Sequence, residues 1–531
     1  MKFIKKHWLI ILSIIIILPT IWPLFRSDFF RMHDWTHVAR LVELDVALKA
    51  GQIPPRWAPD FGWGYGMPLF HYYSPLPYYL AELLYLIKLP AVWAIKAVFA
   101  LNFIAGFYFM YLWAKTFWGK LGGLLAATGF LYLPYRAVDF YVRGTLGELT
   151  AMTFLPLLFY ATHRMVNSSK PKFIFLTALS LAGIFLSHSP IALFSIFFIS
   201  LYFLFHLKSW YKFLFTGLLA FGLSAFFILP AFLEKDFTIV SKIGTGFFHY
   251  SFHFIYLRQL FTRYWGYGGS ILGLEDNISF QLGWPQVILA ALAGLVWLVA
   301  FKHNKKAIIA ELTYIAIAFS SAVFLMTFHS KLIWDKLTVL QITQFPWRLL
   351  TFAATFTAFA SGSLAWLITN KKPLSLIVGL LIFLTIGLNF TYFRPEKFSS
   401  SETFYYTDRN KIKSETSDAL FDYLPVTAIR PEHPSDQLFN FDKLDFTAQG
   451  PGDYIVNQYY FPGWQAKIDN QPVKIEPDSQ LGRIKIDLPS GEHRVEIKLG
   501  KTDIQRWSDI ISLFSWLVLL IYLIKHASRS N

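Results

Sequence analysis

Residues 8–25 read WLIILSIIIILPTIWPLF, an apolar run about long enough to cross the hydrocarbon core of a bilayer as one helix. Lys2, Lys5 and Lys6 precede the run, and Arg26-Ser27-Asp28 follows it. A cleaved signal peptide would have a shorter apolar core and a small-residue cleavage site. We therefore expect an uncleaved signal-anchor helix.

Similar runs recur through most of the chain. Of its 531 residues, 55% are hydrophobic and only 15% are charged, which argues against an ordinary water-soluble protein. The further spans that we expect are 91–114, 120–135, 149–163, 173–188, 190–207, 213–232, 284–301, 307–327, 348–370, 373–392 and 507–525. The sequence thus predicts an α-helical multi-pass membrane protein with about twelve transmembrane helices.

The net charge of +15 reflects how the basic residues are distributed between the two sides of the membrane. Alternate connections between the spans hold 17 basic residues and no acidic ones: Lys2, Lys5, Lys6, Lys115, Lys120, Arg164, Lys170, Lys172, Lys208, Lys212, Lys302, Lys305, Lys306, Lys371, Lys372, Lys525 and Arg529. The positive-inside rule assigns these connections, and with them both termini, to the cytoplasm. The other side is close to neutral, so the charge does not indicate nucleic acid. We expect a cell-membrane location.

This topology requires that residues 76–90 do not cross the membrane. Their sequence, LPYYLAELLYLIKLP, contains tyrosines suited to the headgroup region, so we expect a helix at the outer interface. Four segments are then large enough for chemistry, and all are extracytoplasmic: 26–90, 136–148, 234–283 and 393–506.

The chain divides into three expected parts. Residues 1–392 form a transmembrane domain, with 26–90 as its first outer loop. Residues 393–506 are polar and alternate as strands do, for example in Arg483-Ile484-Lys485-Ile486-Asp487. This pattern predicts an extracytoplasmic antiparallel β-sandwich, followed by a C-terminal helix and cytoplasmic tail at 507–531.

The residue types also limit the chemistry. The chain has no cysteine, which excludes disulfides, thiolate catalysis and iron–sulfur or zinc–thiolate sites. It has no HExxH motif, carboxylate-rich calcium loop or paired histidine spacing. We expect no cofactor; the residues would allow a divalent metal ion but do not indicate one.

Asp34 is the first candidate for catalysis. It lies in Arg31-Met32-His33-Asp34-Trp35, just beyond the first helix, where a carboxylate meets both headgroups and water. There it can act as a general base that removes the proton from an acceptor hydroxyl. The alternative is that Asp34 caps a helix that starts near Trp35.

Arg143 and Glu148 lie in the short outer loop 136–148. The planar guanidinium of arginine suits a phosphate, and the glutamate can bind sugar hydroxyls or neutralise the arginine. A purely structural ion pair between them is the alternative. His188 lies between two later spans on the same side, and it is either a substrate contact or a hydrogen-bonded structural residue.

Arg258, Gln344 and Arg348 complete the candidates. Arg258 stands in an aromatic loop that either lines a sugar site or forms an interfacial belt. Gln344 and Arg348 belong to Gln344-Phe345-Pro346-Trp347-Arg348, at the outer start of a span. The charge of Arg348 can hold a lipid phosphate there, or it can simply reach the interface as a long side chain.

These motifs together resemble the GT-C class of polytopic membrane glycosyltransferases. The chain is most similar to the bacterial and archaeal membrane-protein family labelled "6-pyruvoyl-tetrahydropterin synthase-related", whose inherited label belongs to an unlike soluble enzyme. The motifs that carry the resemblance are His33-Asp34-Trp35, Tyr141-Val142-Arg143-Gly144 with Glu148, Gln344-Phe345-Pro346-Trp347-Arg348 and Tyr460-Phe461-Pro462-Gly463-Trp464.

The resemblance implies a GT-C-like fold, a polyprenyl-phosphate-linked sugar donor and an acceptor glycan, lipid or protein of the cell envelope. It assigns the catalytic carboxylate to Asp34, with Glu148 next. Substrate binding then falls to His33, Arg143, His188, Arg258, Gln344 and Arg348. GT-C enzymes often carry paired acids in the first outer loop, whereas His33 and Trp35 flank Asp34 here.

Two other functions stay open. A lipid-linked glycan transporter or flippase would hold polar residues near the middle of its helices, often in repeated halves. A non-catalytic cell-envelope scaffold would use the β-domain to bind glycan.

Overall fold

The computed structural model describes residues 2–168, 170–242, 244–368, 370–399, 406–441 and 444–527. The chain forms two compact units, each built from three separate stretches. Unit 1 contains residues 1–35, 96–220 and 244–400, and unit 2 contains residues 36–95, 221–243 and 401–531. The boundaries cut through the predicted transmembrane domain, because residues 36–90 of the first outer loop belong to unit 2, whereas residues 26–35 belong to unit 1.

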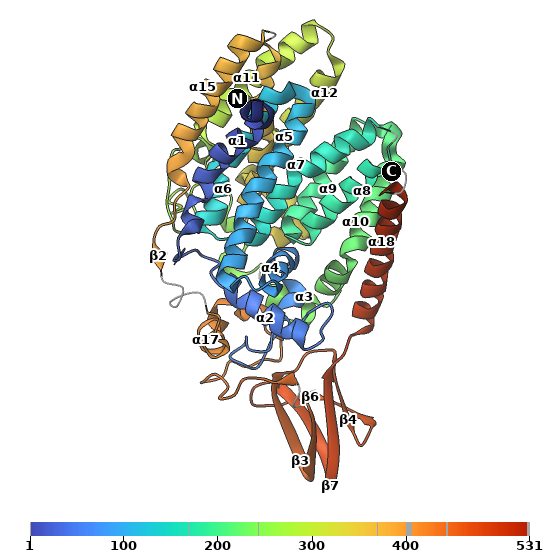
Figure 1. Ribbon diagram of the computed structural model, residues 1–531. Helices are drawn as coiled ribbons and strands as arrows, with labels where there is room; N and C mark the ends of the chain where they lie inside the picture. The colour runs from blue at the N-terminus through green and yellow to red at the C-terminus, as the bar shows by residue number, and fades with distance from the viewer. Residues whose placement is uncertain are drawn as a thin grey trace. The chain divides into compact units, whose positions relative to one another are not determined.

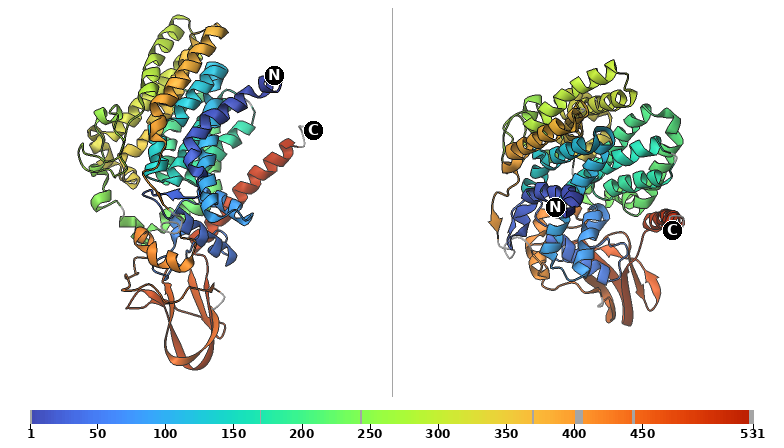
Figure 2. Two further views of the ribbon diagram at one scale, coloured as in Figure 1. Left: turned by 60° about the vertical axis from the view of Figure 1, so that its left-hand side comes forward. Right: turned by 45° about the horizontal axis from the view of Figure 1, so that its top comes forward.

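Unit 1 is almost entirely helical. Its helices are α1 (Lys2–Ile21), most of α5 (Ala91–Leu131), α6 (Pro134–Ala137), α7 (Leu146–Val166), α8 (Lys172–Phe185), α9 (Ser189–Leu204), the first half of α10 (Trp210–Leu233), α11 (Trp284–Lys302), α12 (Lys306–Met326), α13 (Lys331–Lys336), α14 (Leu350–Ser361) and α15 (Lys371–Asn389). Helices α11, α12 and α15 pack side by side (Figures 1 and 2). Strands β1 (Phe29–Phe30) and β2 (Phe398–Ser399) form a short antiparallel pair.

Helix α14 is the centre of unit 1. All twelve of its residues are buried, and it packs against α7, α11 and α12. The ring of Phe359 stacks on Trp113 of α5 with 3.9 Å between the ring centres. The residues that lead into α14 are therefore held on a well-packed element.

Eight helical segments among the described residues are long and apolar enough to cross a membrane: 7–25, 91–131, 207–233, 284–302, 306–326, 346–366, 372–392 and 503–525. The protein is therefore a multi-pass membrane protein, as predicted. Helices occur at all twelve predicted places, but the count of twelve spans is not confirmed.

The difference in count has three causes. The predicted spans 91–114 and 120–135 fall in α5, which is kinked at Gly119, where φ is 72°. Helices α8 and α9 have 14 and 16 residues, or about 21 and 24 Å, which is less than the roughly 30 Å of a hydrocarbon core. Helix α7 is long enough, but Glu148, Thr150 and His163 make it polar.

Unit 2 combines helices with a β-sheet. Its helices are α2 (His37–Lys49), α3 (Leu69–Tyr72), α4 (Leu76–Leu86), α17 (Arg409–Glu415) and α18 (Asp503–Ala527), with the second half of α10. The predicted interfacial helix corresponds to α4, whose 11 residues rise only about 16 Å and cannot cross a bilayer alone.

The β-domain is one antiparallel sheet, whereas the sequence predicted a two-sheet sandwich. Its strands are β3 (Asp445–Tyr459), β4 (Trp464–Ile468), β5 (Gln471–Val473), β6 (Glu476–Pro477) and β7 (Arg483–Leu499), in the order β3-β7-β4-β5 with β6 beside β7 (Figure 1). β7 also pairs with β4 and β6, so all five strands join one sheet. The alternating pattern identified the strands but could not show how they pair.

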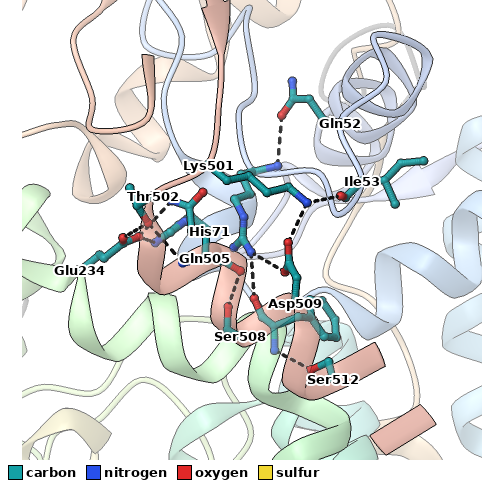
Figure 3. A network of polar contacts seen from close by, with 12 residues as sticks. Gln52, Ile53, His71, Glu234, Lys501, Thr502, Gln505, Ser508, Asp509 and Ser512 are labelled. Carbon is teal, nitrogen blue, oxygen red and sulfur yellow. Dashed lines mark hydrogen bonds and ion pairs between the residues drawn. The ribbon is translucent and has the colours of Figure 1, made fainter. Parts of the chain in front are cut away.

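A buried polar network lies where the sheet leads into α18 (Figure 3). Glu234 is its centre: Nε2 of His71 is 2.9 Å from Oε2 of Glu234, and Nε2 of Gln505 donates to the same oxygen at 3.1 Å. The hydroxyl of Thr502 donates to Oε1. All four side chains belong to unit 2.

The same end of α18 is fixed by charge and by close packing. Asp509 accepts from Arg56 at 3.1 Å and from Lys501 at 2.7 Å (Figure 3). One turn further on, the hydroxyl of Ser512 donates to the carbonyl of Gly222 on α10 at 2.8 Å. Hydrogen bonds through small side chains are a common way for membrane helices to pack.

Candidate active site

The segment between α6 and α7 builds the centre of the site in unit 1. After α6 the chain makes a π-helical turn over Val138–Val142, and Gly144 then adopts a φ of 66° before α7 begins. A Cβ atom at Gly144 would lie 2.1 Å from Sδ of Met32. Glycine is thus required here both by its backbone conformation and by the close approach of the first outer loop.

This turn holds the predicted base against the predicted phosphate ligand. The backbone N–H of His33 donates to the carbonyl of Val142 at 3.0 Å, and that of Asp34 donates to the carbonyl of Arg143 at 2.8 Å. Nε2 of His33 donates to the carbonyl of Tyr267 at 2.8 Å. Thr36 is the N-cap residue of α2.

Arg143 and Glu148 form the ion pair that the sequence left open. Nη2 of Arg143 is 2.9 Å from Oε2 of Glu148, and Nη1 is 2.5 Å from Oδ1 of Asp139. The hydroxyls of Tyr135 and Thr351 donate to Oε1 of Glu148 at 2.6 and 3.2 Å. Glu148 is 0% exposed and is surrounded by donors.

Arg348 joins this pair from the start of α14. Its Nε is 3.4 Å from Oε2 of Glu148, so the Glu148 carboxylate forms ion pairs with the guanidinium groups of both Arg143 and Arg348. Nη1 of Arg348 donates to the carbonyl of Thr343 at 2.7 Å and lies 3.4 Å from Oε1 of Gln344. We call Tyr135, Asp139, Arg143, Glu148 and Arg348 the arginine–carboxylate cluster.

Several polar atoms beside the cluster lack a protein partner. Nη2 of Arg348 makes no hydrogen bond to a described residue, and the buried Nε1 of Trp347 and Oγ1 of Thr343 are also unpaired. The guanidinium of Arg143 covers the ring of Trp347 at 4.6 Å. Unpaired buried donors are rare in proteins and point to a missing water or ligand.

His188 lies close to the cluster and caps the following helix. Its Nδ1 accepts from the backbone N–H of Ile191 at 3.3 Å and so caps α9. Burial and the charge of Arg348 lower the pKa of His188 to about 3, so the ring is neutral at pH 7. Because Nδ1 accepts, the single ring proton lies on Nε2.

The two carboxyl groups of the cluster differ in their affinity for protons. Burial, together with the neighbouring charge of Glu148, raises the pKa of Asp139 well above its usual range, although Arg143 opposes this. Burial also disfavours the charge of Arg143, but Glu148 and Asp139 more than offset it and raise its pKa. Arg143 therefore stays charged, and Asp139 is the carboxyl group that takes up a proton more readily.

Arg258 is the predicted site residue that the structure does not bring into the cluster. It lies exposed on the turn Leu257–Leu260, and it forms no ion pair with any carboxylate in the described part of the chain. The described residues also contain no group of three or more His, Asp or Glu side chains arranged to hold a metal ion.

Four contributors were missed in the sequence: Tyr135, Asp139, Trp347 and Thr351. Asp139 could have been paired with Arg143 from their i, i+4 spacing alone. No local signal marks Tyr135 or Thr351, because each matters only through its contact with Glu148, and Thr351 is 203 positions away from it.

Comparison with known proteins adds little to this geometry. No protein-family model matches the chain. Over 248 residues the chain is 29% identical to an uncharacterized protein of Lactococcus lactis subsp. cremoris, a match that covers 43% of this chain and 40% of that protein.

The similarity to solved structures is partial. The cryo-EM structure of the mycobacterial arabinofuranosyltransferase AftD aligns with 74% of this chain and 28% of its own, with 12% identity and a TM-score of 0.45. A likeness at this level carries no conclusion about the activity of the present protein.

Proposed function

We propose that this protein is a membrane glycosyltransferase that moves a sugar from a polyprenyl-phosphate donor to an acceptor of the cell envelope. The observation that carries the proposal is the hydrogen bond from the backbone of Asp34 to that of Arg143. It holds a candidate base beside two arginines that share a buried counter-charge. A base next to a phosphate site is the minimum that glycosyl transfer from a phosphate needs.

In the proposed reaction, Asp34 removes the proton of an acceptor hydroxyl. The acceptor oxygen bonds to the anomeric carbon from the face opposite the donor phosphate. The bond between that carbon and the phosphate oxygen breaks, and the electron pair leaves with the polyprenyl phosphate. Configuration at the anomeric carbon is inverted.

Arg348 is the proposed phosphate ligand, because its Nη2 carries donors without a described partner. Positive charge stabilises a phosphate leaving group directly and needs no strong general acid. Arg143 adds charge, and Nε1 of Trp347 and Oγ1 of Thr343 supply further donors.

The role of Glu148 changes from the one that the sequence indicated. With 0% exposure and four donors around it, it cannot reach an acceptor hydroxyl. We assign it as a positioning residue that fixes both guanidinium groups. His33 supports the segment that carries Asp34 through its hydrogen bond to Tyr267, and Gln344 supports Arg348. Arg258 stays a proposed contact for a distal part of the substrate.

The finer assignments rest on the sequence resemblance. These are the GT-C class, the "6-pyruvoyl-tetrahydropterin synthase-related" family, the polyprenyl-phosphate donor, the envelope acceptor and the extracytoplasmic active face. No cofactor is part of the proposed reaction.

One observation favours a transporter as the second candidate. Glu311 is buried in the candidate span α12, where it accepts from the hydroxyl of Tyr202 at 3.1 Å. That hydroxyl is also 3.1 Å from Nδ1 of His163. Buried ionisable groups in membrane helices often mark transport or proton pathways.

The test is to incubate the purified protein with a panel of radiolabelled polyprenyl-phosphate sugars and to measure sugar transfer and donor hydrolysis. We expect one donor to be consumed, and we expect Asp34→Asn to abolish this while leaving membrane insertion intact. Asp28→Asn, six residues earlier in the same loop, is the matched control and should keep full activity. Near-normal transfer by Asp34→Asn would remove Asp34 from its role. Movement of intact donor across vesicles without its consumption would favour the transporter.

A further inference from the structure

Two segments of unit 1 outside the candidate spans pack together around one tryptophan. They are residues 246–261 and 327–343, which we call the apolar shelf. The ring of Trp334 is 0% exposed and stacks on Tyr250 with 5.4 Å between ring centres, and the hydroxyl of Tyr250 donates to Asp335. The backbone N–H of Ile255 donates to the carbonyl of Met326, the last residue of α12.

The other side of the shelf is apolar and uncovered. Phe328 is 63% exposed and Leu332 is 64% exposed, although Trp334 on the same short helix is fully buried. The further large apolar side chains exposed on the shelf include Leu257, Leu337, Val339 and Ile342. Large apolar side chains that are exposed together on one surface mark an interaction site.

The shelf continues a surface that faces lipid. Helix α12 is a candidate span, and Phe324 in its last turn is exposed, as is Phe328 one turn later. The longest helical pieces of the shelf, Lys331–Lys336 and Thr338–Thr343, have six residues each and are too short to cross a membrane. Within the shelf, Arg258, Lys331 and Lys336 outnumber the single acidic residue, Asp335.

We propose that the apolar shelf is a membrane-binding surface that lies in the boundary between headgroups and acyl chains. Its apolar side would enter the acyl region, and its basic residues would meet anionic headgroups, as in interfacial helices. The partner is the lipid bilayer of the membrane that the neighbouring spans cross, with no protein partner needed.

The position of the shelf has a consequence for the site. Residue 343 ends the shelf, and Gln344 and Arg348 follow directly. A shelf in the headgroup layer places Arg348 at the depth of a lipid phosphate. The membrane contact itself does not depend on the proposed function; only this consequence does.

The absence of cysteine from the chain makes a direct test simple. Single-cysteine variants Leu332→Cys, Val339→Cys and Leu257→Cys carry a nitroxide label in vesicles of phosphatidylethanolamine with a minority of phosphatidylglycerol. Collision rates with oxygen, which concentrates in lipid, and with a neutral nickel chelate, which stays in water, are then measured. Two exposed positions calibrate the scale: Phe383→Cys on the candidate span α15, and Lys474→Cys in the β-domain.

We expect the oxygen-to-nickel collision ratio at the three shelf positions to lie within about twofold of that at Phe383→Cys and several-fold above that at Lys474→Cys. A ratio equal to that at Lys474→Cys would overturn the proposal, because the shelf would then face water. Protection from both reagents would overturn it as well, since a protein, such as a second copy, would then cover the shelf. The measurement needs no enzymatic activity, so its outcome is independent of glycosyl transfer.

Discussion

At the scale of single residues, the two buried carboxylates of the cluster are not equivalent. Glu148 binds both arginines and two hydroxyls, whereas Asp139 binds only Arg143 and leaves Oδ2 unpaired. Leaving buried charges without their partner costs more than replacing a buried carboxyl group that is already neutral. Glu148 should therefore dominate the stability of the cluster.

This difference predicts unequal effects of neutral substitutions. Glu148→Gln should destabilise the protein by about 3–5 kcal/mol, because it leaves two buried guanidinium groups without their shared counter-charge. Asp139→Asn should cost clearly less, because the raised pKa of Asp139 already favours its neutral form. Thermal unfolding of both variants in detergent measures the difference. Equal losses would mean that both carboxylates carry the same charge in the native protein.

Arg348 should be sensitive to the shape of its side chain as well as to its charge. Arg348→Lys keeps the charge but cannot contact Glu148, Thr343 and a phosphate at once. We expect kcat for transfer to fall by about 10²-fold, the usual cost of losing one transition-state donor. Arg394→Lys, at an exposed position of the same unit, is the control. A change in KM alone would instead assign Arg348 to ground-state binding.

At the scale of elements, the turn between α6 and α7 has the strictest steric requirement. Gly144→Ala should cost about 1–2 kcal/mol for the left-handed backbone alone, with a further loss from the contact with Met32. Met32→Ala removes the two closest atoms, so the double variant should recover part of that further loss. A double-mutant cycle on the thermal unfolding of the four proteins measures the coupling. Strictly additive losses would show that Met32 does not restrict position 144.

The attachment of α18 should weaken in acid. Burial opposes the charge of Glu234, but hydrogen bonds from His71, Thr502 and Gln505 lower its pKa, and burial lowers the pKa of His71. In both groups the unfolded state binds protons more readily, so the stabilising effect is present at pH 7. It is lost as the pH falls below about 6.5 for His71 and below about 4.3 for Glu234.

Hydrogen exchange of residues 502–512 against pH measures this loss. Protection should decrease from pH 7 to pH 4, and Glu234→Gln should lower the protection at pH 7 and flatten its pH dependence. An unchanged profile in that variant would mean that the network does not hold the start of α18.

The sequence predicted most elements but few of their partners. Long apolar runs such as 8–25 and 284–301 identify helices directly, because a helix that crosses the lipid needs a continuous run of apolar residues. The kink at Gly119 and the single sheet depend on contacts between distant residues, and a local pattern does not contain them. The same limit applies to the site: Arg143 and Glu148 are close in sequence, but Arg348 joins them only through the packing of α14.

At the scale of the whole molecule, the side of the membrane is the prediction on which the proposed chemistry depends. Four candidate spans, 284–302, 306–326, 346–366 and 372–392, separate residue 275 from residue 474. An even number of crossings puts both residues on one side. The basic connections put Lys305, between the first two of these spans, in the cytoplasm.

Single-cysteine variants of the cysteine-free chain test this arrangement in intact cells. A membrane-impermeant maleimide should label Glu275→Cys and Lys474→Cys directly, and Lys305→Cys only after the cells are permeabilised. All three positions are exposed, so a lack of labelling reports the membrane barrier and not burial. Labelling of only one of the first two positions would show that one of the four helices does not cross. The fully reversed pattern would place Asp34 and both arginines on the cytoplasmic side, where a soluble nucleotide sugar is as accessible a donor as a lipid-linked one.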